Sequence, residues 1–233
     1  MRKFIPQNMS IKDKYTVRSI ESNEVKEWIL YKHYAKRMPP IEYSFGLFNN
    51  ILRGIITYGT PPSSNLRESF GNKFKMIELN RLCVNEELGK NVLSYFVSLS
   101  LKLLPSPLII VSYADTAQNH HGYIYQATNF IYTGLSAKRT DWKIKGMESL
   151  HGATIADMSR GKENRAKYMR AKYGSDFYLE DRSRKHRYFY FIGNKKQKAE
   201  MLKLLPYSIE SYPKGDNQRY NANYQPSVNL NLF

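Results

Sequence analysis

Residues 107–134 constrain the fold more than any other stretch of this sequence. They open with an uninterrupted apolar run at residues 108–111, long enough for a strand buried on both faces and too short for a helix. Ser112, Tyr113 and Asp115 follow directly. Because open α/β sheets place ligands at the C-terminal ends of their strands, this run predicts the functional edge of a central sheet.

The rest of the stretch predicts a compact unit that returns to the sheet. Residues 118–122 read as a polar turn, residues 123–129 fit one or two helical turns, and residues 130–132 form a strand that ends at Gly134. One sheet edge therefore gathers a carboxylate, two imidazoles and several phenols.

Asp115 is the first catalytic candidate of this edge, because a carboxylate at the end of a buried strand needs a partner. An Asx turn with Ala117 or Gln118 would also supply one. The adjacent His120 and His121 are either general bases or solvated turn residues.

The residues before this stretch predict most of a sheet. A strand at residues 15–20 precedes a helix from residue 23 to about residue 37, with His33 and Tyr34 in its last turns and two prolines after it. The elements that follow are hairpin strands at 42–48 and 51–58, a loop at 61–74 that is either mobile or substrate-covering, a central strand at 76–84, a turn at 85–91 and a helix at 92–104.

This order, antiparallel strands first and an αβ crossover afterwards, is that of the GNAT acyltransferase fold. In that fold a splayed pair of central strands opens a cleft for the acyl donor. We therefore expect an α/β (α+β) class with a GNAT-like mixed, mostly antiparallel central sheet flanked by helices. The expected division is a core at residues 1–135, a basic appendage at 136–186, a strand and helix completing the core at 187–220, and a tail at 221–233.

The charge of the chain indicates a polyanionic partner. The formal net charge is +16 and the isoelectric point is about 9.7. Residues 136–198 hold 17 Lys and Arg against 7 Asp and Glu, which places +10 of that charge in one segment. A solubilising surface normally mixes both signs, whereas this segment interleaves cations with aromatic rings. Its predicted elements are helices at 161–173 and 195–204 and a strand at 188–192, and its candidate DNA contacts are Arg165, Arg170, Arg182, Arg184, Lys185 and Arg187.

The sequence also indicates the cellular compartment, because it excludes an internal disulfide and a membrane-spanning helix. The single cysteine rules out an internal disulfide, and no apolar run approaches the ~20 residues of a membrane-spanning helix. We expect a cytoplasmic protein without a membrane partner.

The turn at residues 85–91 is where a GNAT enzyme would bind the pyrophosphate of an acyl-CoA-like donor, through backbone N–H groups at a helix N-terminus. Glu86 and Glu87 would repel a diphosphate, and an ordinary strand-to-helix turn explains the same residues. The candidate donor contacts are Leu82, Cys83, Val84, Gly89, Lys90 and Asn91.

Five motifs together resemble the Mom-type DNA-modification proteins of bacteriophages. They are KHYAKRMPP, ELNRLCV, VSYADTAQNHHGYIYQATNFIYTG, SRKHRYFYF and the YPKGD tail, spanning roughly residues 28–220. The resemblance implies a GNAT-like fold and a small carbamoylmethyl-type group added to adenine N6 of double-stranded phage DNA, which then escapes host restriction. It also implies an active-site cluster of His33, Tyr34 and Asp115, with iron as the metal if one is bound, and with Ser112, Tyr125 and Tyr132 nearby.

The implied chemistry suits these residues. Adenine N6 is a poor nucleophile because its lone pair is delocalised, so a base or an activated donor is needed. The base is also stacked in a duplex, so we expect it to flip out. Our hypothesis is that Asp115 acts as base or metal ligand and that His33 and Tyr34 position it.

Two other functions fit the same sequence. One is a GNAT N-acetyltransferase that acts on RNA, a protein or a small amine. The other is a nucleic-acid-binding protein that has lost catalysis on a GNAT scaffold. Binding of acetyl-CoA without any response to DNA would favour the first, and salt-dependent binding to DNA that stays unmodified would favour the second. The oligomeric state stays open between monomer and dimer.

Overall fold

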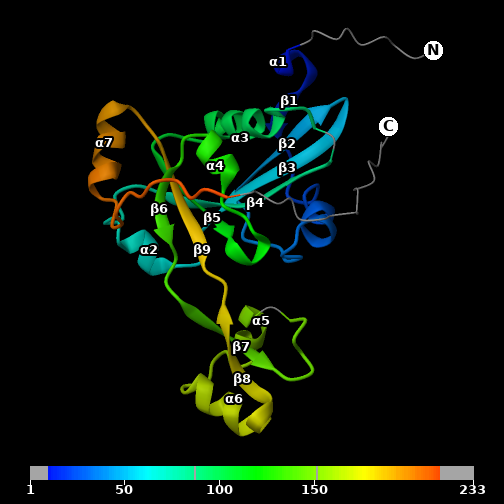
Figure 1. The fold of residues 1–233 in the computed structure, drawn as a ribbon, viewed down its shortest axis with the longest axis vertical. Coiled ribbons are helices and arrows are strands. Elements are labelled where there is room, and N and C mark those ends of the chain that lie inside the picture. The colour runs from blue at the N-terminus through cyan, green and yellow to red at the C-terminus, as the bar shows by residue number, and fades with distance from the viewer. Residues whose placement is uncertain (1–9, 87, 151, 216–233) are drawn as a thin grey trace, which may run out of the picture.

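The computed structural model describes residues 10–86, 88–150 and 152–215. Its main body is a seven-stranded sheet in the order β1-β2-β3-β4-β5-β9-β6 (Figure 1). The strands are β1 Thr16–Ser19, β2 Tyr43–Asn49, β3 Ile51–Gly59, β4 Met76–Val84, β5 Leu108–Asp115, β6 Ile131–Leu135 and β9 Lys185–Ile192. The predicted tail at 221–233 lies outside the described residues.

Neighbouring strands run antiparallel throughout this sheet except for β4 and β5, which are parallel. The predicted class, a mixed and mostly antiparallel sheet flanked by helices, is confirmed. Pairing between β4 and β5 runs from Met76↔Ile109 to Leu79↔Ser112. The ends of both strands lie beyond this paired segment, so the two central strands splay as predicted.

Helices cover both faces of the sheet. The helices α3 (Val92–Leu103) and α4 (Tyr123–Ala127) contribute Phe96, Val97 and Tyr125 to the larger apolar core. On the opposite face, α7 (Lys195–Lys203) and the short α2 (Ser64–Glu68) contribute Met201 and Leu66 to a second cluster. Because apolar side chains cover both faces of the sheet, β5 is buried on both sides, which explains its uninterrupted apolar run.

The predicted helix from residue 23 to residue 37 is wrong in its extent. A turn leads instead into a single π-helical turn, η1 (Trp28–Lys32), in which the His33 N–H donates to the Trp28 carbonyl at 2.9 Å. His33 then has extended backbone and Lys36 a φ of +42°, so the helical segment ends at Lys32, five residues earlier than predicted. Trp28 and Ile29 anchor the turn in a third apolar cluster with Cys83.

Three smaller expectations also need correction. The strand β5 continues through Ser112 and Tyr113 to Asp115 instead of ending at residue 111. Gly134 lies within β6, where the register with β9 shifts, and does not end that strand. The predicted loop at 61–74 contains α2, whose N-cap Ser63 accepts a hydrogen bond from the Leu66 N–H.

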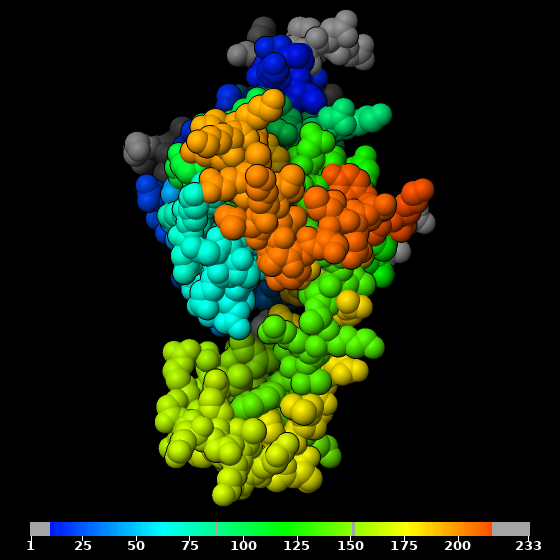
Figure 2. Space-filling model, turned by 90° about the vertical axis from the view of Figure 1, so that its left-hand side faces the viewer, coloured from blue at the N-terminus to red at the C-terminus, as the bar shows by residue number. Residues whose placement is uncertain are grey.

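Residues 139–182 form a separate lobe, hereafter the appendage. Its elements are β7 Arg139–Ile144, α5 Gly152–Asp157, α6 Arg165–Tyr173, the 3₁₀ turn η3 Gly174–Asp176 and β8 Phe177–Arg182. The strands β7 and β8 pair with each other, and Ile144, Ile155, Met169 and Phe177 form an apolar core under them. Figures 1 and 2 show this lobe below the main body. Two segments connect it to the sheet, one from β6 to β7 and one from β8 to β9. Of these elements, the sequence predicted α6, which begins four residues later than expected.

After α7 the chain crosses the edge strand β6. The Glu210 N–H donates to the Tyr132 carbonyl at 3.0 Å and the Tyr212 hydroxyl donates to the Phe130 carbonyl at 2.7 Å. In the described ranges, no helix has the length and apolarity that a bilayer crossing requires.

Candidate active site

An acidic side chain that the sequence analysis overlooked lies where β4 and β5 separate. Glu78 occupies β4 opposite Gly59 of β3 and Val111 of β5, one residue before the last paired position. Burial raises the pKa of its carboxyl to about 7, against the opposing charges of Lys185 and Arg81. A carboxyl that titrates near neutral pH can accept a proton from a substrate and release it again.

Tyr34 lies within electrostatic reach of this carboxyl, and the His33 ring stacks on Tyr34. Their rings stack at 4.4 Å, and the Ala35 N–H donates to His33 Nδ1 at 3.1 Å. Burial lowers the pKa of His33 to about 3, helped by the charges of Arg81, His120 and Lys185. Burial also raises the pKa of Tyr34 to about 12, with further contributions from Asp115 and Glu78. The imidazole is therefore neutral and the phenol protonated at physiological pH.

Asp115 is 8% exposed and is held by three protein groups. Its Oδ1 accepts hydrogen bonds from the Ala117 N–H at 3.0 Å and from the Ser183 hydroxyl at 2.6 Å. Its Oδ2 lies 3.5 Å from Lys185 Nζ. The predicted Asx turn is therefore present, and the side chain is fixed as a paired carboxylate.

Two cations complete the cluster. Arg81, on β4, donates to the Arg37 carbonyl at 2.8 Å and to the Asn80 carbonyl at 2.6 Å, which ties the strand to the chain after η1. Lys185 begins β9 opposite Asp115. Lys185 is thus a neighbour of both carboxyl groups. Its charge opposes the rise in the pKa of Glu78, and its ammonium group forms an ion pair with Asp115.

The other predicted catalytic residues divide into two groups. The Ser112 hydroxyl donates to the Leu79 carbonyl at 2.9 Å and also bonds to the buried Tyr125 hydroxyl. Burial raises the pKa of Tyr125, and the nearby Tyr34 and Glu78 add to that effect. Tyr132 lies two strands away from β5, on β6, where its hydroxyl bonds to His186 Nδ1 at 2.8 Å. The structure therefore brings Ser112 and Tyr125 to the cluster and leaves Tyr132 apart.

The arrangement of His33, Tyr34 and Asp115 does not fit a bound cation. Both carboxylate oxygens of Asp115 are engaged, one of them by an ammonium group, and Arg81 and Lys185 place positive charge around His33. No set of three or more His, Cys, Asp or Glu side chains within residues 10–86, 88–150 and 152–215 is arranged to hold a metal.

The predicted donor contacts lie along the free end of β4 and the turn after it. Leu82, Cys83 and Val84 pair with β3, and the Cys83 side chain is buried in a cluster with Trp28. Asn91 caps α3 with a φ of +66°, and no described side chain caps the first turn of that helix. Glu86 lies 4.0 Å from Lys32, which offsets part of the repulsion expected for a diphosphate.

The residues predicted to contact DNA differ in how strongly the protein already engages them. Arg184 donates to the Ser136 carbonyl at 2.7 Å, Lys185 pairs with Asp115, and Arg187 donates to the Thr133 carbonyl at 2.9 Å. On the appendage, Arg165 donates to Ser159 Oγ at 3.0 Å and Arg182 Nε lies 3.9 Å from Asp141. Arg170 and Arg182 are exposed, whereas Arg184, Lys185 and Arg187 are half-buried.

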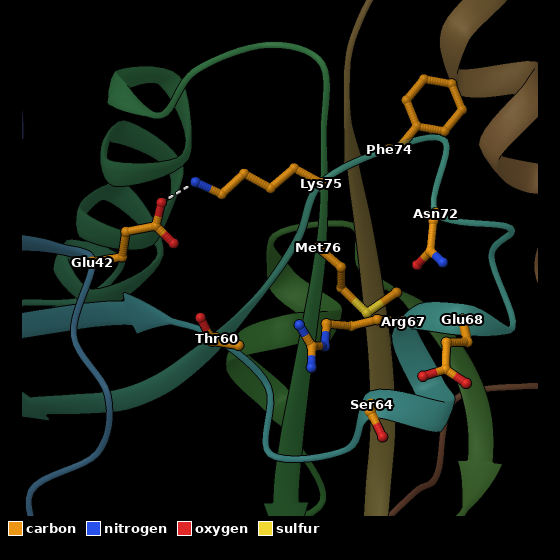
Figure 3. A pocket seen from close by; sticks show the side chains of 9 residues that line it. All are labelled: Glu42, Thr60, Ser64, Arg67, Glu68, Asn72, Phe74, Lys75 and Met76. Carbon is orange, nitrogen blue, oxygen red and sulfur yellow. Dashed lines mark hydrogen bonds and ion pairs between the residues drawn. The ribbon is translucent and has the colours of Figure 1, made fainter.

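A polar cavity of about 470 Å³ lies between the start of β4 and the α2 segment (Figure 3). The ion pair of Glu42 with Lys75 borders one side, and Glu68 and Asn72 of the α2 segment border the other. Met76 lines it two residues before Glu78, and alternate residues of a strand share a face. The predicted loop at 61–74 therefore borders this cavity through Ser64, Arg67, Glu68, Asn72 and Phe74.

A model of the Mom protein family matches residues 14–214. The chain belongs to the Mom protein family. It is 29% identical over 192 residues to methylcarbamoylase mom of Escherichia phage Mu, an alignment that covers 78% of this chain and 77% of that protein.

Solved structures with low identity also match this chain. The spermidine/spermine N-acetyltransferase SpeG of Vibrio cholerae, solved with manganese ions, has a TM-score of 0.42 at 9% identity, covering 83% of this chain and 99% of that one. An N-acetyltransferase of Staphylococcus aureus Mu50 has a TM-score of 0.41 at 12% identity, covering 76% and 98%. A GNAT-family acetyltransferase of Bacillus cereus has a TM-score of 0.40 at 10% identity, covering 76% and 97%.

The sequence analysis missed Glu78, Arg81 and Ser183 as site residues. A signal for the first two was available, because the strand MIELNRLCV places one carboxylate and one guanidinium among apolar residues of a central strand, where a charge needs a partner. Ser183 had no such signal, since its partner Asp115 is 68 residues away.

Proposed function

We propose that this protein is a transferase that adds a small acyl or carbamoylmethyl-type group to adenine N6 in DNA, protecting that DNA from restriction endonucleases. Membership in the Mom family and similarity to a methylcarbamoylase support transfer of such a group. The observation that carries the proposal is the cluster of Glu78, Asp115, Tyr34 and His33 at the splay of β4 and β5, next to a basic lobe.

In this proposal the two carboxylates have different roles. The N6 lone pair attacks the transferred carbon of an activated donor, the N–C bond forms, and the leaving group departs with the electron pair of the broken bond. Glu78 takes the proton that N6 loses, because its carboxyl titrates near neutral pH. Asp115, fixed as a carboxylate by Lys185 and Ser183, stabilises the positive charge that develops on the nitrogen.

His33 and Tyr34 serve as neutral partners for the substrate. The protonated phenol of Tyr34 can donate a hydrogen bond. Because His33 Nδ1 accepts a hydrogen bond from the Ala35 N–H, the neutral imidazole carries its proton on Nε2. An acyl-CoA-like donor would lie along Leu82–Val84 (residues 82–84), with its phosphates at the backbone of residues 89–91. Such a donor supplies an activated carbon and a good leaving group.

The appendage holds the duplex while the base enters the site. Arg170 and Arg182 display cations on an exposed surface, which suits phosphate contacts. The target adenine is stacked in a duplex and must flip out to reach Glu78. We place this reaction in the host cytoplasm.

The test is the mass of the nucleosides in DNA from cells that express the protein. Plasmid DNA is digested to nucleosides and compared with DNA from cells carrying an empty vector. The proposal predicts a deoxyadenosine species of higher mass in the expressing cells and resistance of the plasmid to restriction enzymes that cut at adenine-containing sites. Deoxyadenosine of unchanged mass in well-expressing cells would refute it.

A further inference from the structure

The appendage packs its own core and is joined to the main body through two strand segments. Ile144, Ile155, Met169 and Phe177 are buried together within it. The connecting segments run from β6 into β7 and from β8 into β9 (Figure 1). The position of the lobe relative to the sheet therefore depends on how these segments are held.

The second connecting segment, residues 183–185, forms hydrogen bonds with Ser136 of the first connecting segment and with Thr116 after β5. The Arg184 guanidinium donates to the Ser136 carbonyl at 2.7 Å, and the Lys185 N–H donates to Ser136 Oγ at 2.9 Å. The Arg184 carbonyl accepts from the Thr116 hydroxyl at 2.8 Å and from the Thr116 N–H at 3.2 Å. These bonds fix the segment against the end of β5.

The same segment supplies two of the three groups that hold Asp115. Ser183 Oγ donates to Oδ1 at 2.6 Å and Lys185 Nζ lies 3.5 Å from Oδ2, while Ala117 is the contributor from the strand's own turn. Ser183 is the residue directly after β8, the last strand of the appendage. Residues that directly follow the appendage therefore orient a carboxylate of the main body.

We propose that Ser183 and Lys185 are positioning residues that couple the seating of the appendage to the orientation of the Asp115 carboxylate. This inference rests on the proposed function. Lys185 is paired with Asp115 in the β5–β9 ladder, whereas Ser183 lies two residues before β9 begins. A rotation of the lobe would therefore displace the Ser183 hydroxyl first, and a displacement near 1 Å breaks a hydrogen bond of this length. Full activity would then depend on the lobe keeping the seating in which Ser183 reaches Asp115.

The experiment separates DNA affinity from the rate of modification. Ser183→Ala removes the hydroxyl, Ser183→Thr keeps it, and Ser175→Ala removes an exposed hydroxyl elsewhere on the appendage as the matched control. Affinity is measured by fluorescence anisotropy with a duplex oligonucleotide. The rate is the accumulation of modified deoxyadenosine in plasmid DNA after induction, at equal protein levels.

We expect Ser183→Ala to lower the modification rate about ten- to a hundredfold, the loss typical of a misplaced reacting group, with an unchanged duplex affinity. Ser183→Thr and Ser175→Ala should retain the wild-type rate. A wild-type rate in Ser183→Ala, an equal loss of affinity, or a failure of Ser183→Thr to restore the rate would overturn the inference. If Ser183→Ala melts more than about 5 °C below the wild type, Lys185→Met is measured in its place with the modification rate as the readout: the rate should fall by a similar factor, and a wild-type rate would overturn the inference.

Hydrogen exchange gives a result that does not depend on catalysis. The Ala117 N–H donates to the same carboxylate oxygen as Ser183, so its exchange should be several-fold faster in Ser183→Ala and should change in the wild type when the duplex is added. If wild-type protein leaves DNA unmodified but shows both exchange effects, the proposed function fails and the coupling stands. Unchanged exchange in Ser183→Ala overturns the coupling whatever the activity.

Discussion

Replacing Glu78 by glutamine should stabilise the protein at alkaline pH, which is an unusual outcome for a substitution in a buried cluster. Glutamine has the shape of glutamic acid and cannot ionise. The pKa of Glu78 is raised from 4.5 in an unperturbed side chain to about 7 in the folded protein. The folded state therefore keeps a proton between those values that the unfolded chain has released, so stability falls as pH rises through this window.

The size of the effect follows from the same difference. About 2.5 pH units at ~1.4 kcal/mol each give an upper value of ~3 kcal/mol, and partial exposure of the side chain to water lowers it to about 1–3 kcal/mol. Below pH 4.5 the native side chain and glutamine are both neutral, so the variant and the wild type should have equal free energies of unfolding.

The assay is urea denaturation at pH 4.5, 6 and 8, with Glu68→Gln as the control for loss of an exposed carboxylate. We expect Glu78→Gln to be more stable than the wild type at pH 8 and indistinguishable from it at pH 4.5, with Glu68→Gln near the wild type at each pH. Equal free energies at pH 8, or a destabilised variant there, would refute the reasoning that the folded protein bears the free-energy cost of this carboxylate.

Three further predictions follow from named contacts. Asp115→Asn should reduce modified deoxyadenosine in plasmid DNA about a hundredfold, because the neutral amide cannot stabilise developing positive charge; undiminished modification would exclude an electrostatic role. Arg170→Glu should weaken duplex binding about tenfold and reduce the slope of log affinity against log salt by about 1, whereas a slope equal to that of the wild type would remove this residue from the interface. Phe96→Ala, in the fully buried core under α3, should lower the free energy of unfolding by about 3–5 kcal/mol in urea denaturation, and a loss below about 1 kcal/mol would contradict the packing described.

The sequence predicted the parts of the fold that depend on local patterns. Alternation and turn residues gave the hairpin of β2 and β3 and the strand β4 within a residue or two, and the apolar run gave β5. The strands β7 and β8 were missed because their paired residues are 33 (Ile144↔Phe177) to 43 (Arg139↔Arg182) positions apart and include many polar residues. Such a pairing is fixed by tertiary contacts and leaves little local signal.

The site was predictable where one stretch carried it. Asp115 and Ser112 follow a buried run, and the KHYAKRMPP motif placed His33 and Tyr34 near each other, although the helix expected to carry them is a single π turn. Lys185 was predicted as a DNA contact, and its contact with Asp115 comes from the antiparallel register of β5 and β9. A register between strands 70 residues apart is set by packing, which a single sequence does not reveal.

The most direct measurement is the amount of modified deoxyadenosine in plasmid DNA from cells expressing the wild type, Glu78→Gln or Glu78→Asp at matched levels. We predict a deoxyadenosine of raised mass with the wild type, a smaller amount with Glu78→Asp, and a loss of more than a hundredfold with Glu78→Gln although that variant is folded. Equal amounts of the modified nucleoside with the wild type and Glu78→Gln would contradict the account.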